Sequence, residues 1–587
     1  MVRTVIRRDE LGITPVFPAG MPLWLSQTLL AAASGLLMAA APPPLGQWWA
    51  APLGAGLLGL AVFHAGFWRG FWLGTVGGFT YFLPTLYFIA FSLETNWVWF
   101  LLSGFEALFV GAAGAVTGLA LKARTWPALP SFPEQRRLGL SQVLIASAVW
   151  ALCFAGLDVL RSYYPWGGLA WANLSYTQVD GPLLGYVRYL SSAGLVALVV
   201  FLGTAAVLAV RSTRPTAIAV AGILAATALF SPRLAPLNLE AGAPTIKVAA
   251  VQGNVNNPGM DAFLIAAEVS GNHAEETKRA GRAAQERGWA LDMVLWPENA
   301  ADLDPRAHQE IADLVSDAYR EVNAPIAVGA VRYERIVAGA EGGAPAVAPG
   351  PRGAQKKAAA ETSSTLVRYN DVVVFDGAKY GEVYTKQVPA PFAEFLPLRS
   401  LVTQLTDLSD LLSIDMLPGQ KPAVLPIPAA QLGRDVNVGV GICFEVGVGS
   451  VMRQAARGEF LYIPTNNSNF GYTAESEQQL DMTRLRAAEF DRSAVQISTV
   501  GVSGVVGPDG ALLDKRDLFS PAHLLFEVPV GNTALTPAAK WGGHVEAALV
   551  FAVALTCLLG LLRSGQARLA KAESVKRKEA RKSYNEV

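Results

Sequence analysis

The sequence predicts a polytopic α-helical membrane protein with about eight spans, into which one layered α/β sandwich domain outside the cytoplasm is inserted. Three observations support this. Of the 587 residues, 52% are hydrophobic and only 16% are charged, which is too apolar for a soluble protein. The apolar residues concentrate before residue 235 and after residue 544, whereas the chain between them has an ordinary soluble composition. The basic residues that flank the apolar segments alternate regularly along the chain.

The candidate spans are apolar segments close to the length of about 20 residues that a helix needs to cross the hydrocarbon core. They cover residues 22–41, 48–65, 70–91, 97–121, 142–160, 184–210, 216–232 and 545–562. No convincing cleavage site follows the first segment, so it is interpreted as a retained span and not as a signal peptide.

The basic residues predict the orientation, because Lys and Arg favour cytoplasmic loops. They precede the first span and follow the second, fourth, sixth and eighth, as eight spans with both termini in the cytoplasm require. The resulting domains are a cytoplasmic N-terminus at 1–21, a seven-span membrane domain at 22–232, an extracytoplasmic domain at 233–544, and a basic cytoplasmic tail at 563–587 after the eighth span.

Strand and helix patterns alternate in the extracytoplasmic domain. Strands are expected at 245–252, 293–296, 326–331, 364–375, 436–442, 459–463, 494–500 and 523–528, and helices at 273–289, 305–322 and 475–492. Strands that alternate with helices, together with a meander, are typical of a layered α/β sandwich.

Two segments of this domain depart from the pattern. Residues 337–362 are rich in Ala, Gly, Pro and Lys without periodicity, and are interpreted as a disordered insertion. Residues 395–417, which include Leu398, Leu401 and Leu405, are unusually apolar for a loop. They form either a buried helical hairpin or a lid that touches lipid and lines a substrate entrance.

Three reactive side chains each follow a predicted strand. Glu298 ends the run Leu-Trp-Pro-Glu, Lys386 follows Tyr-Thr, and Cys443 follows Val-Gly-Val-Gly-Ile. The other two cysteines lie in predicted spans. A carboxylate, an amine and a thiol at strand exits suit acyl transfer, with Cys443 as nucleophile, Glu298 as general base and Lys386 as oxyanion stabiliser. The structural alternatives are a packed thiol, a helix-capping acid and a solvated lysine.

The composition gives no indication of a cofactor or a nucleic-acid partner. The five histidines show no metal-ligand spacing, and no glycine-rich phosphate loop with a lysine is present, so no metal, nucleotide or other cofactor is expected. The 47 basic and 47 acidic residues balance, and this zero net charge does not point to nucleic acid.

Glu298, Lys386 and Cys443, in this order, resemble the catalytic triad of the nitrilase (carbon–nitrogen hydrolase) superfamily. The resemblance implies a nitrilase-like αββα sandwich for residues 233–544. Glu394 resembles the second glutamate of that superfamily and is expected to pair with Lys386. The supporting residues implied around the triad are Phe444, Glu445, which is expected to pair with Arg486, and Asn466 after the following strand.

A nitrilase-like domain between seven spans and an eighth resembles the apolipoprotein N-acyltransferase family. Asn96-Trp97-Val98, Tyr164-Pro165-Trp166 and residues 176–182 are similar to loops of that family. The resemblance implies that a phospholipid donates its sn-1 acyl chain to the cysteine as a thioester. The α-amine of an N-terminal diacylglyceryl-cysteine on an apolipoprotein then takes the chain. The insertion and the basic tail indicate an actinobacterial type of member.

Two other functions remain as alternatives: a membrane-anchored amidase or nitrilase that hydrolyses a small amide, and a membrane scaffold for lipid-modifying enzymes. The family resemblance implies a multi-pass protein of the bacterial plasma (inner) membrane. Its expected partners are a phospholipid donor, a diacylglyceryl apolipoprotein acceptor and membrane lipid. The basic tail is expected either to meet anionic lipid heads or other membrane lipid-processing enzymes, or to be simply solvated.

Overall fold

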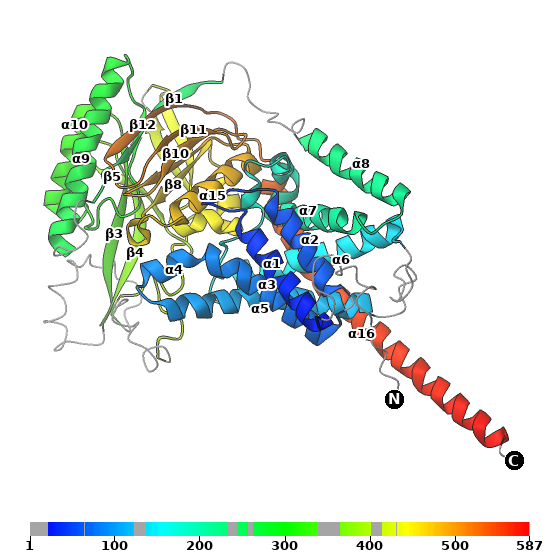
Figure 1. Cartoon of the computed structure of the whole chain (residues 1–587). Helices are drawn as coiled ribbons and strands as arrows, with labels where there is room; N and C mark the ends of the chain where they lie inside the picture. Colours follow the sequence, from blue (N-terminus) through cyan, green and yellow to red (C-terminus); the bar gives the residue numbers. More distant parts are fainter. Residues whose placement is uncertain are drawn as a thin grey trace. The chain divides into compact units, whose positions relative to one another are not determined.

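The computed structural model describes residues 21–63, 65–122, 137–231, 243–255, 262–337, 364–400, 414–429 and 431–585 (Figure 1). The chain divides into two compact units, and neither is contiguous in sequence. The helical unit comprises Met1–Ser162, Ala172–Leu234 and Gly542–Val587, and the sandwich unit comprises Tyr163–Trp171 and Ala235–Trp541. The short segment Tyr163–Trp171 thus belongs to the sandwich unit, although the sequence placed it within the membrane domain.

Each of the eight predicted spans overlaps at least one helix. The helices are α1 (Leu23–Ala39), α2 (Ala50–Val62), α3 (Phe67–Thr85), α4 (Tyr87–Ser92), α5 (Asn96–Lys122), α6 (Leu140–Tyr163), α7 (Val187–Ala209), α8 (Arg214–Phe230) and α16 (Pro537–Asn585). Among the described residues, four helices are long and apolar enough to cross a membrane, namely those at 96–121, 140–163, 184–209 and 537–566. Three shorter apolar helices are α1, α2 and α8.

The predicted third span, 70–91, is two helices and not one. Pro84 lies in the last turn of α3, and the chain turns at Leu86 before α4 begins. A proline inside a helix removes one backbone donor and clashes with the preceding turn, which favours a break there.

Glycines allow the helices of this unit to pack closely. A Cβ atom on Gly56 of α2 would collide with the backbone of Gly203 on α7, and one on Gly203 would collide with the backbone of Pro52. Gly70 of α3 and Gly114 of α5 face each other in the same way. Helices in membranes gain little from the hydrophobic effect and associate through such small-residue contacts.

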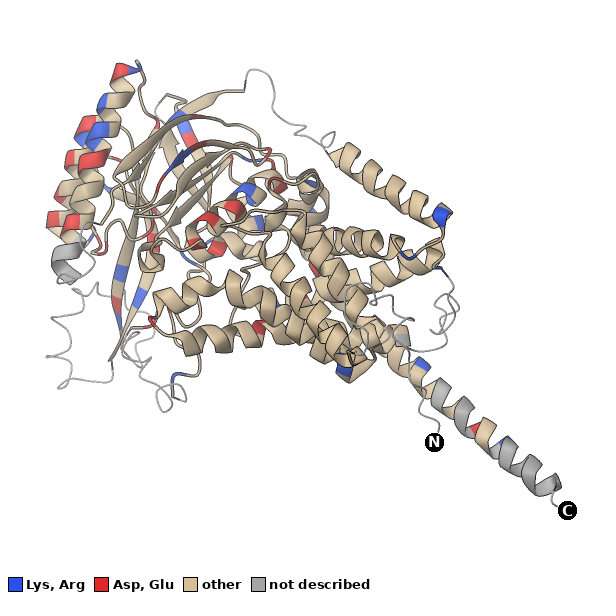
Figure 2. Cartoon of the chain, in the orientation of Figure 1, with Lys and Arg blue, Asp and Glu red and all other residues tan. Residues whose placement is uncertain are grey.

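Charged residues are sparse on the described part of the helical unit and dense on two helices of the sandwich unit, α9 and α10 (Figure 2). One buried cluster of charges in the helical unit is paired. Arg161, at the end of α6, lies 2.7 Å from Asp158 and 3.0 Å from Glu106 on α5. Pairing of this kind is what makes a charge tolerable at membrane depth.

The sandwich unit contains two six-stranded sheets. The first has the order β12-β1-β2-β3-β4-β5 and the second the order β11-β10-β9-β8-β7-β6. The strands are β1 (Thr245–Gln252), β2 (Met293–Leu295), β3 (Ile326–Val337), β4 (Ser364–Phe375), β5 (Tyr380–Thr385), β6 (Val424–Ala429), β7 (Arg434–Val440), β8 (Phe460–Thr465), β9 (Ala494–Ser498), β10 (Ser503–Val506), β11 (Leu512–Arg516) and β12 (Ala522–Pro529). In each sheet three neighbouring strands are parallel, β1-β2-β3 and β7-β8-β9, and the other pairs are antiparallel.

Helices cover the outer face of each sheet. On the first sheet α9 (Ala262–Glu286) and α10 (Gln309–Val322) lie side by side and bury an apolar core that includes Trp296, Val315 and Val328 (Figure 1). On the second sheet lie α14 (Gly449–Ala455) and α15 (Glu475–Phe490). The inner faces of the two sheets meet, and the hydroxyl of Tyr462 on β8 donates to the carbonyl of Trp296 after β2. The unit therefore has four layers.

The remaining elements differ in extent from the sequence expectation. Helix α9 begins at Ala262 and not at residue 273. The predicted ranges did not include β5, β6, β10, β11 and α14. The predicted insertion 337–362 lies outside the described residues apart from Val337, which ends β3. The central part of the segment 395–417 likewise lies outside them, from 401 to 413.

Candidate active site

The three candidate catalytic residues follow three strands from two different sheets. Glu298 comes after β2 and Lys386 directly after β5, both in the first sheet. Cys443 comes after β7 of the second sheet and begins the short 3-10 turn Cys443–Gly447. The candidate nucleophile and the candidate base are thus held by separate sheets of the sandwich, and each follows closely after a strand.

Lys386 is the cation at the centre of the site. Its Nζ lies 3.2 Å from Oε1 of Glu298 and 2.7 Å from Oε1 of Glu394, and the lysine side chain is 1% exposed. Burial acts to lower the pKa of Lys386, but the two carboxylates outweigh it and hold the pKa above its usual value. The expected ion pair with Glu394 is present, and Lys386 is a fixed positive charge.

Cys443 has a strained backbone and a protonated thiol. Its φ of +50° lies in the left-handed region, which is uncommon for a residue with a side chain and is often found at functional sites. Burial raises the pKa of the thiol well above its usual value; Glu298 raises it further, and Lys386 lowers it. Because the resting sulfur keeps its proton, a base must remove that proton as the sulfur attacks.

Glu298 is placed to be that base. Its side chain is 4% exposed. Burial raises the pKa of Glu298, Lys386 lowers it, Glu394 raises it, and a hydrogen bond with Cys443 lowers it. The amide Nδ2 of Asn370, on β4, donates to Oε1 of Glu298 over 2.6 Å. A desolvated carboxylate with its pKa moved upward can accept a proton from a thiol and return it later.

Glu445 joins the segment after Lys386 to the turn that carries the cysteine. Its buried carboxylate accepts hydrogen bonds from the backbone N–H groups of Ile442 (2.9 Å), Gln387 (2.6 Å) and Val388 (3.0 Å), and from the hydroxyl of Tyr384 (2.9 Å). Burial raises the pKa of Glu445 to about 7, and Lys386 and these donors act in the opposite direction.

The expected pairing of Glu445 with Arg486 is wrong. Arg486 donates to the carbonyls of Val446 (2.9 Å) and Gly447 (2.9 Å) and forms an ion pair with Glu489 on its own helix. The arginine thus fixes the end of the cysteine turn through the backbone. Phe444, between the nucleophile and Glu445, is a buried side chain.

Asn466 and the three leucines lie in different surroundings. Asn466 accepts the N–H of Ser468 over 3.2 Å in a local turn after β8. Leu398 is 55% exposed and has a φ of +51°. Leu401 and Leu405 fall outside the described residues. Across the described residues, His, Cys, Asp and Glu form no group of three or more that could hold a metal ion.

Sequence reasoning missed a chain of polar side chains behind the nucleophile. Gln479 on α15 donates from Nε2 to Sγ of Cys443 over 3.5 Å. Asn467, next to the predicted Asn466, donates from Nδ2 to Oε1 of Gln479 (2.9 Å) and to Oε2 of Glu475 (2.8 Å). The sequence carries no signal for this chain of residues, because α15 is polar in sequence although its side chains are almost all buried.

Comparisons with known proteins match both units. Residues 34–205 match the apolipoprotein N-acyltransferase N-terminal domain, and residues 247–537 match the carbon-nitrogen hydrolase family. A protein of Mycolicibacterium smegmatis named apolipoprotein N-acyltransferase is 30% identical over 91% of this chain and 85% of its own length. The chain belongs to the apolipoprotein N-acyltransferase family. This agrees with the resemblance seen in the sequence, including the actinobacterial type of member.

Other members of the family are similar over most of the chain. A protein of Azotobacter vinelandii with the same name is 29% identical over 87% of this chain and 91% of its own. One of Pseudomonas aeruginosa is 26% identical over 93% of this chain and 99% of its own. Glu298, Lys386 and Cys443 all lie within residues 247–537, the part of the chain that matches the carbon-nitrogen hydrolase family.

Proposed function

We propose that this acyltransferase moves the sn-1 acyl chain of a phospholipid through Cys443 to the α-amine of the diacylglyceryl-cysteine at the N-terminus of an apolipoprotein. The observation that carries the proposal is the placement of one buried cation, Lys386, between Glu298 and Glu394, with Glu298 hydrogen-bonded to the thiol. This arrangement has a nucleophile, a base and an oxyanion stabiliser in the same chain as long apolar helices.

The first half-reaction forms a thioester. Glu298 takes the thiol proton as Sγ of Cys443 attacks the ester carbonyl, and the ammonium of Lys386 stabilises the oxyanion of the tetrahedral intermediate. The carbon–oxygen bond then breaks, and Glu298 gives its proton to the leaving oxygen, which departs on the lysophospholipid. The enzyme is left as an acyl-cysteine with Glu298 ionised.

The second half-reaction forms the amide. The neutral α-amine attacks the thioester carbonyl, and Lys386 again stabilises the oxyanion. The carbon–sulfur bond breaks, and the proton lost by the nitrogen passes through Glu298 to Sγ of Cys443. Storage of the acyl group as a thioester allows two bulky lipid substrates to use one site in turn.

The membrane arrangement belongs to the same proposal. Eight spans, with both termini in the cytoplasm of a bacterium and the sandwich unit outside its plasma membrane, would bring the site to the leaflet that holds both substrates. Four long apolar helices and three shorter ones support a membrane protein. The apolar segment 395–417, with Leu398, Leu401 and Leu405, is proposed to line the acyl entrance. We assign anionic lipid heads as the contact of the basic tail.

The test is the mass of the protein after incubation with phospholipid alone. One fatty acyl group is expected on the peptide that contains Cys443, and hydroxylamine should remove it. Cys443→Ala and Cys443→Ser should give no such adduct and no triacylated lipoprotein, whereas the matched control Cys557→Ser, on α16, should behave as the wild type. Acylation that needs both substrates together would overturn the two-step course.

The alternative of a small-amide hydrolase has less support. The same triad would serve it, but the helical unit would have no part in the reaction, and the relatives carry the N-acyltransferase name over most of their length. A scaffold would not need the three catalytic side chains to be held together.

A further inference from the structure

One buried carboxyl group near the nucleophile has no cationic partner. Glu298 and Glu394 both lie against Lys386, and Glu445 accepts four hydrogen bonds. Glu475, which is 1% exposed, accepts a single neutral hydrogen bond, from Nδ2 of Asn467 over 2.8 Å. Within the described part of the chain, no Lys, Arg or His lies within ion-pair distance of Glu475. None of the steps described above uses it.

The geometry connects this carboxyl to the reacting sulfur. Glu475 and Gln479 are one turn apart on α15 and therefore on the same face of the helix. Nδ2 of Asn467 bridges the two, and Gln479 reaches Sγ of Cys443 over 3.5 Å. Oδ1 of Asn467 accepts the hydroxyl of Ser498 over 2.6 Å, which fixes the amide with its Nδ2 toward Glu475.

A buried carboxylate without a cation is costly. Removal from water disfavours its charged form by several kcal/mol unless a partner is supplied. Burial raises the pKa of Glu475 to about 8; the hydrogen bond from Asn467 lowers it, and Glu298 raises it. The group is thus ready to ionise as soon as a positive charge arrives beside it.

We propose that Glu475 receives the acceptor: it binds the incoming primary α-ammonium group as its counter-ion and removes the proton that this group must lose before it can attack the thioester. The inference rests on the proposed function and extends it, because it assigns recognition of the amine to a residue other than the general base. The ligand class is an α-ammonium group on a lipid-modified peptide.

The second half-reaction requires a second group that accepts a proton. The α-amino group has a pKa of about 7.7–8.0, so it arrives largely as an ammonium ion. That ion must lose one proton before attack and a second after it. Glu298 is committed to the second, which it passes to the sulfur as the carbon–sulfur bond breaks. Glu475 gives its own proton to solvent as the ammonium ion arrives, then takes the first proton of that ion and so returns to the carboxylic acid of the free enzyme.

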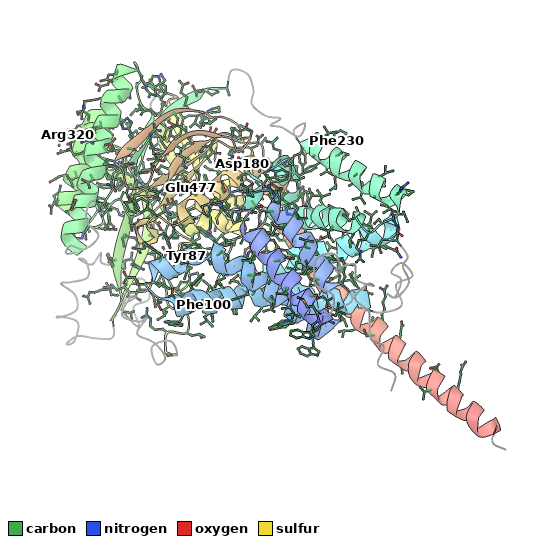
Figure 3. The ribbon with its side chains drawn as sticks, viewed as in Figure 1. Tyr87, Phe100, Asp180, Phe230, Arg320 and Glu477 are labelled. Atoms are coloured by element: carbon green, nitrogen blue, oxygen red, sulfur yellow. The ribbon has the colours of Figure 1, made fainter. Side chains whose placement is uncertain are left out.

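The experiment separates the two half-reactions in the full-length protein. Acyl-enzyme is formed with phospholipid alone, and its discharge by a diacylglyceryl peptide is then followed. Glu475→Gln should slow the discharge of the acyl-enzyme by the peptide about 100-fold more than it slows formation of the acyl-enzyme. A factor of this size is expected when a general base is lost. The matched control is Glu477→Gln on the same helix (Figure 3), a 37% exposed side chain that pairs with Lys515 and should transfer as the wild type does.

A second nucleophile distinguishes proton removal from a structural effect. Hydroxylamine is uncharged at neutral pH and should discharge the thioesters of wild type and Glu475→Gln at equal rates, and Glu475→Asp should restore part of the peptide reaction. Equal loss with peptide and hydroxylamine, or peptide transfer at the wild-type rate, would overturn the inference. Failure of the wild type to form any acyl-cysteine would instead refute the proposed function.

Discussion

Asn370 donates a hydrogen bond to Oε1 of Glu298 over 2.6 Å, the same oxygen that lies 3.2 Å from Nζ of Lys386. The backbone carbonyl of Asn370 also accepts the N–H of Lys386 over 2.9 Å. One residue of β4 therefore orients both Glu298 after β2 and Lys386 after β5.

We expect Asn370→Ala to slow thioester formation about 10- to 100-fold, the cost of one hydrogen bond to a charged group. Asn370→Asp should be slower still, since a second negative charge disfavours ionisation of Glu298. Rates of acyl-enzyme formation by mass spectrometry check both. Asn272→Ala, which removes an amide on α9, is the control, and a loss as large as that of Asn370→Ala would point to general destabilisation.

Glu298→Gln and Lys386→Ala should block the first half-reaction and not only the transfer to the amine. Both residues act on the first tetrahedral intermediate as well as the second, and Lys386→Ala also leaves Glu298 and Glu394 without their shared cation. Incubation with phospholipid alone should give no acyl mass on Cys443. Normal accumulation of acyl-enzyme in Lys386→Ala would show that the oxyanion role is wrong.

The stability of the sandwich unit should fall as the pH rises, because of Glu475. Its pKa is raised from 4.5 to about 8 in the folded protein, so the folded state binds this proton more tightly than the unfolded state does. The contribution of this group to the free energy of unfolding is complete below about pH 4.5. It falls by about 1.4 kcal/mol per pH unit as the pH rises from there, and it is lost once the pH has passed through about 8.

Glu475→Gln should therefore lower the pH dependence of the midpoint of thermal unfolding between those limits and raise the midpoint at alkaline pH. Glu445, which has a pKa of about 7 and many donors, contributes in the same direction and should remain in the variant. An unchanged pH slope in Glu475→Gln would mean that its pKa is not raised.

Gly203→Ala should destabilise the helical unit and reduce the amount of folded protein recovered from membranes. The added methyl group would meet the backbone of Pro52, which cannot move aside as a side chain can. Gly222→Ala on α8 is the control, since no atom lies within 4 Å of the added Cβ. Thermal unfolding in one detergent compares the two, and equal midpoints would contradict the close packing of α2 and α7.

The strands that sequence patterns missed have physical reasons to look irregular. Strand β6 contains Pro426 and Pro428, which argue against a central strand. It lies at an edge of its sheet, where it pairs only with β7. A proline there can face the side that has no neighbouring strand, so that its lack of an N–H group removes no hydrogen bond from the sheet. Strands β10 and β11 have only four and five residues, and they flank a tight turn at Gly507–Gly510.

The proximity of the three candidate catalytic residues could be predicted because each is a reactive side chain beside a recognisable strand. Asn370 could not, since it lies inside β4, and its contact with Glu298 spans 72 residues. Glu475 and Gln479 occur on a helix whose polar sequence suggests exposure, and only tertiary packing buries it. The expected Glu445–Arg486 pair does not form because Glu445 accepts backbone N–H groups and the hydroxyl of Tyr384, whereas Arg486 pairs with Glu489 and donates to two backbone carbonyls.

The segment Tyr163–Trp171 gives the sandwich unit a discontinuous chain. Nε1 of Trp171 donates to Gln478 over 2.8 Å, and Arg453 donates to the hydroxyl of Tyr163 over 3.4 Å. Excision of residues 235–541 by cuts at two points would thus leave behind a piece of the domain's own interior. Trp171 also leaves the ribosome 307 residues before its partner. During synthesis this segment must therefore wait until the helix that receives it has followed.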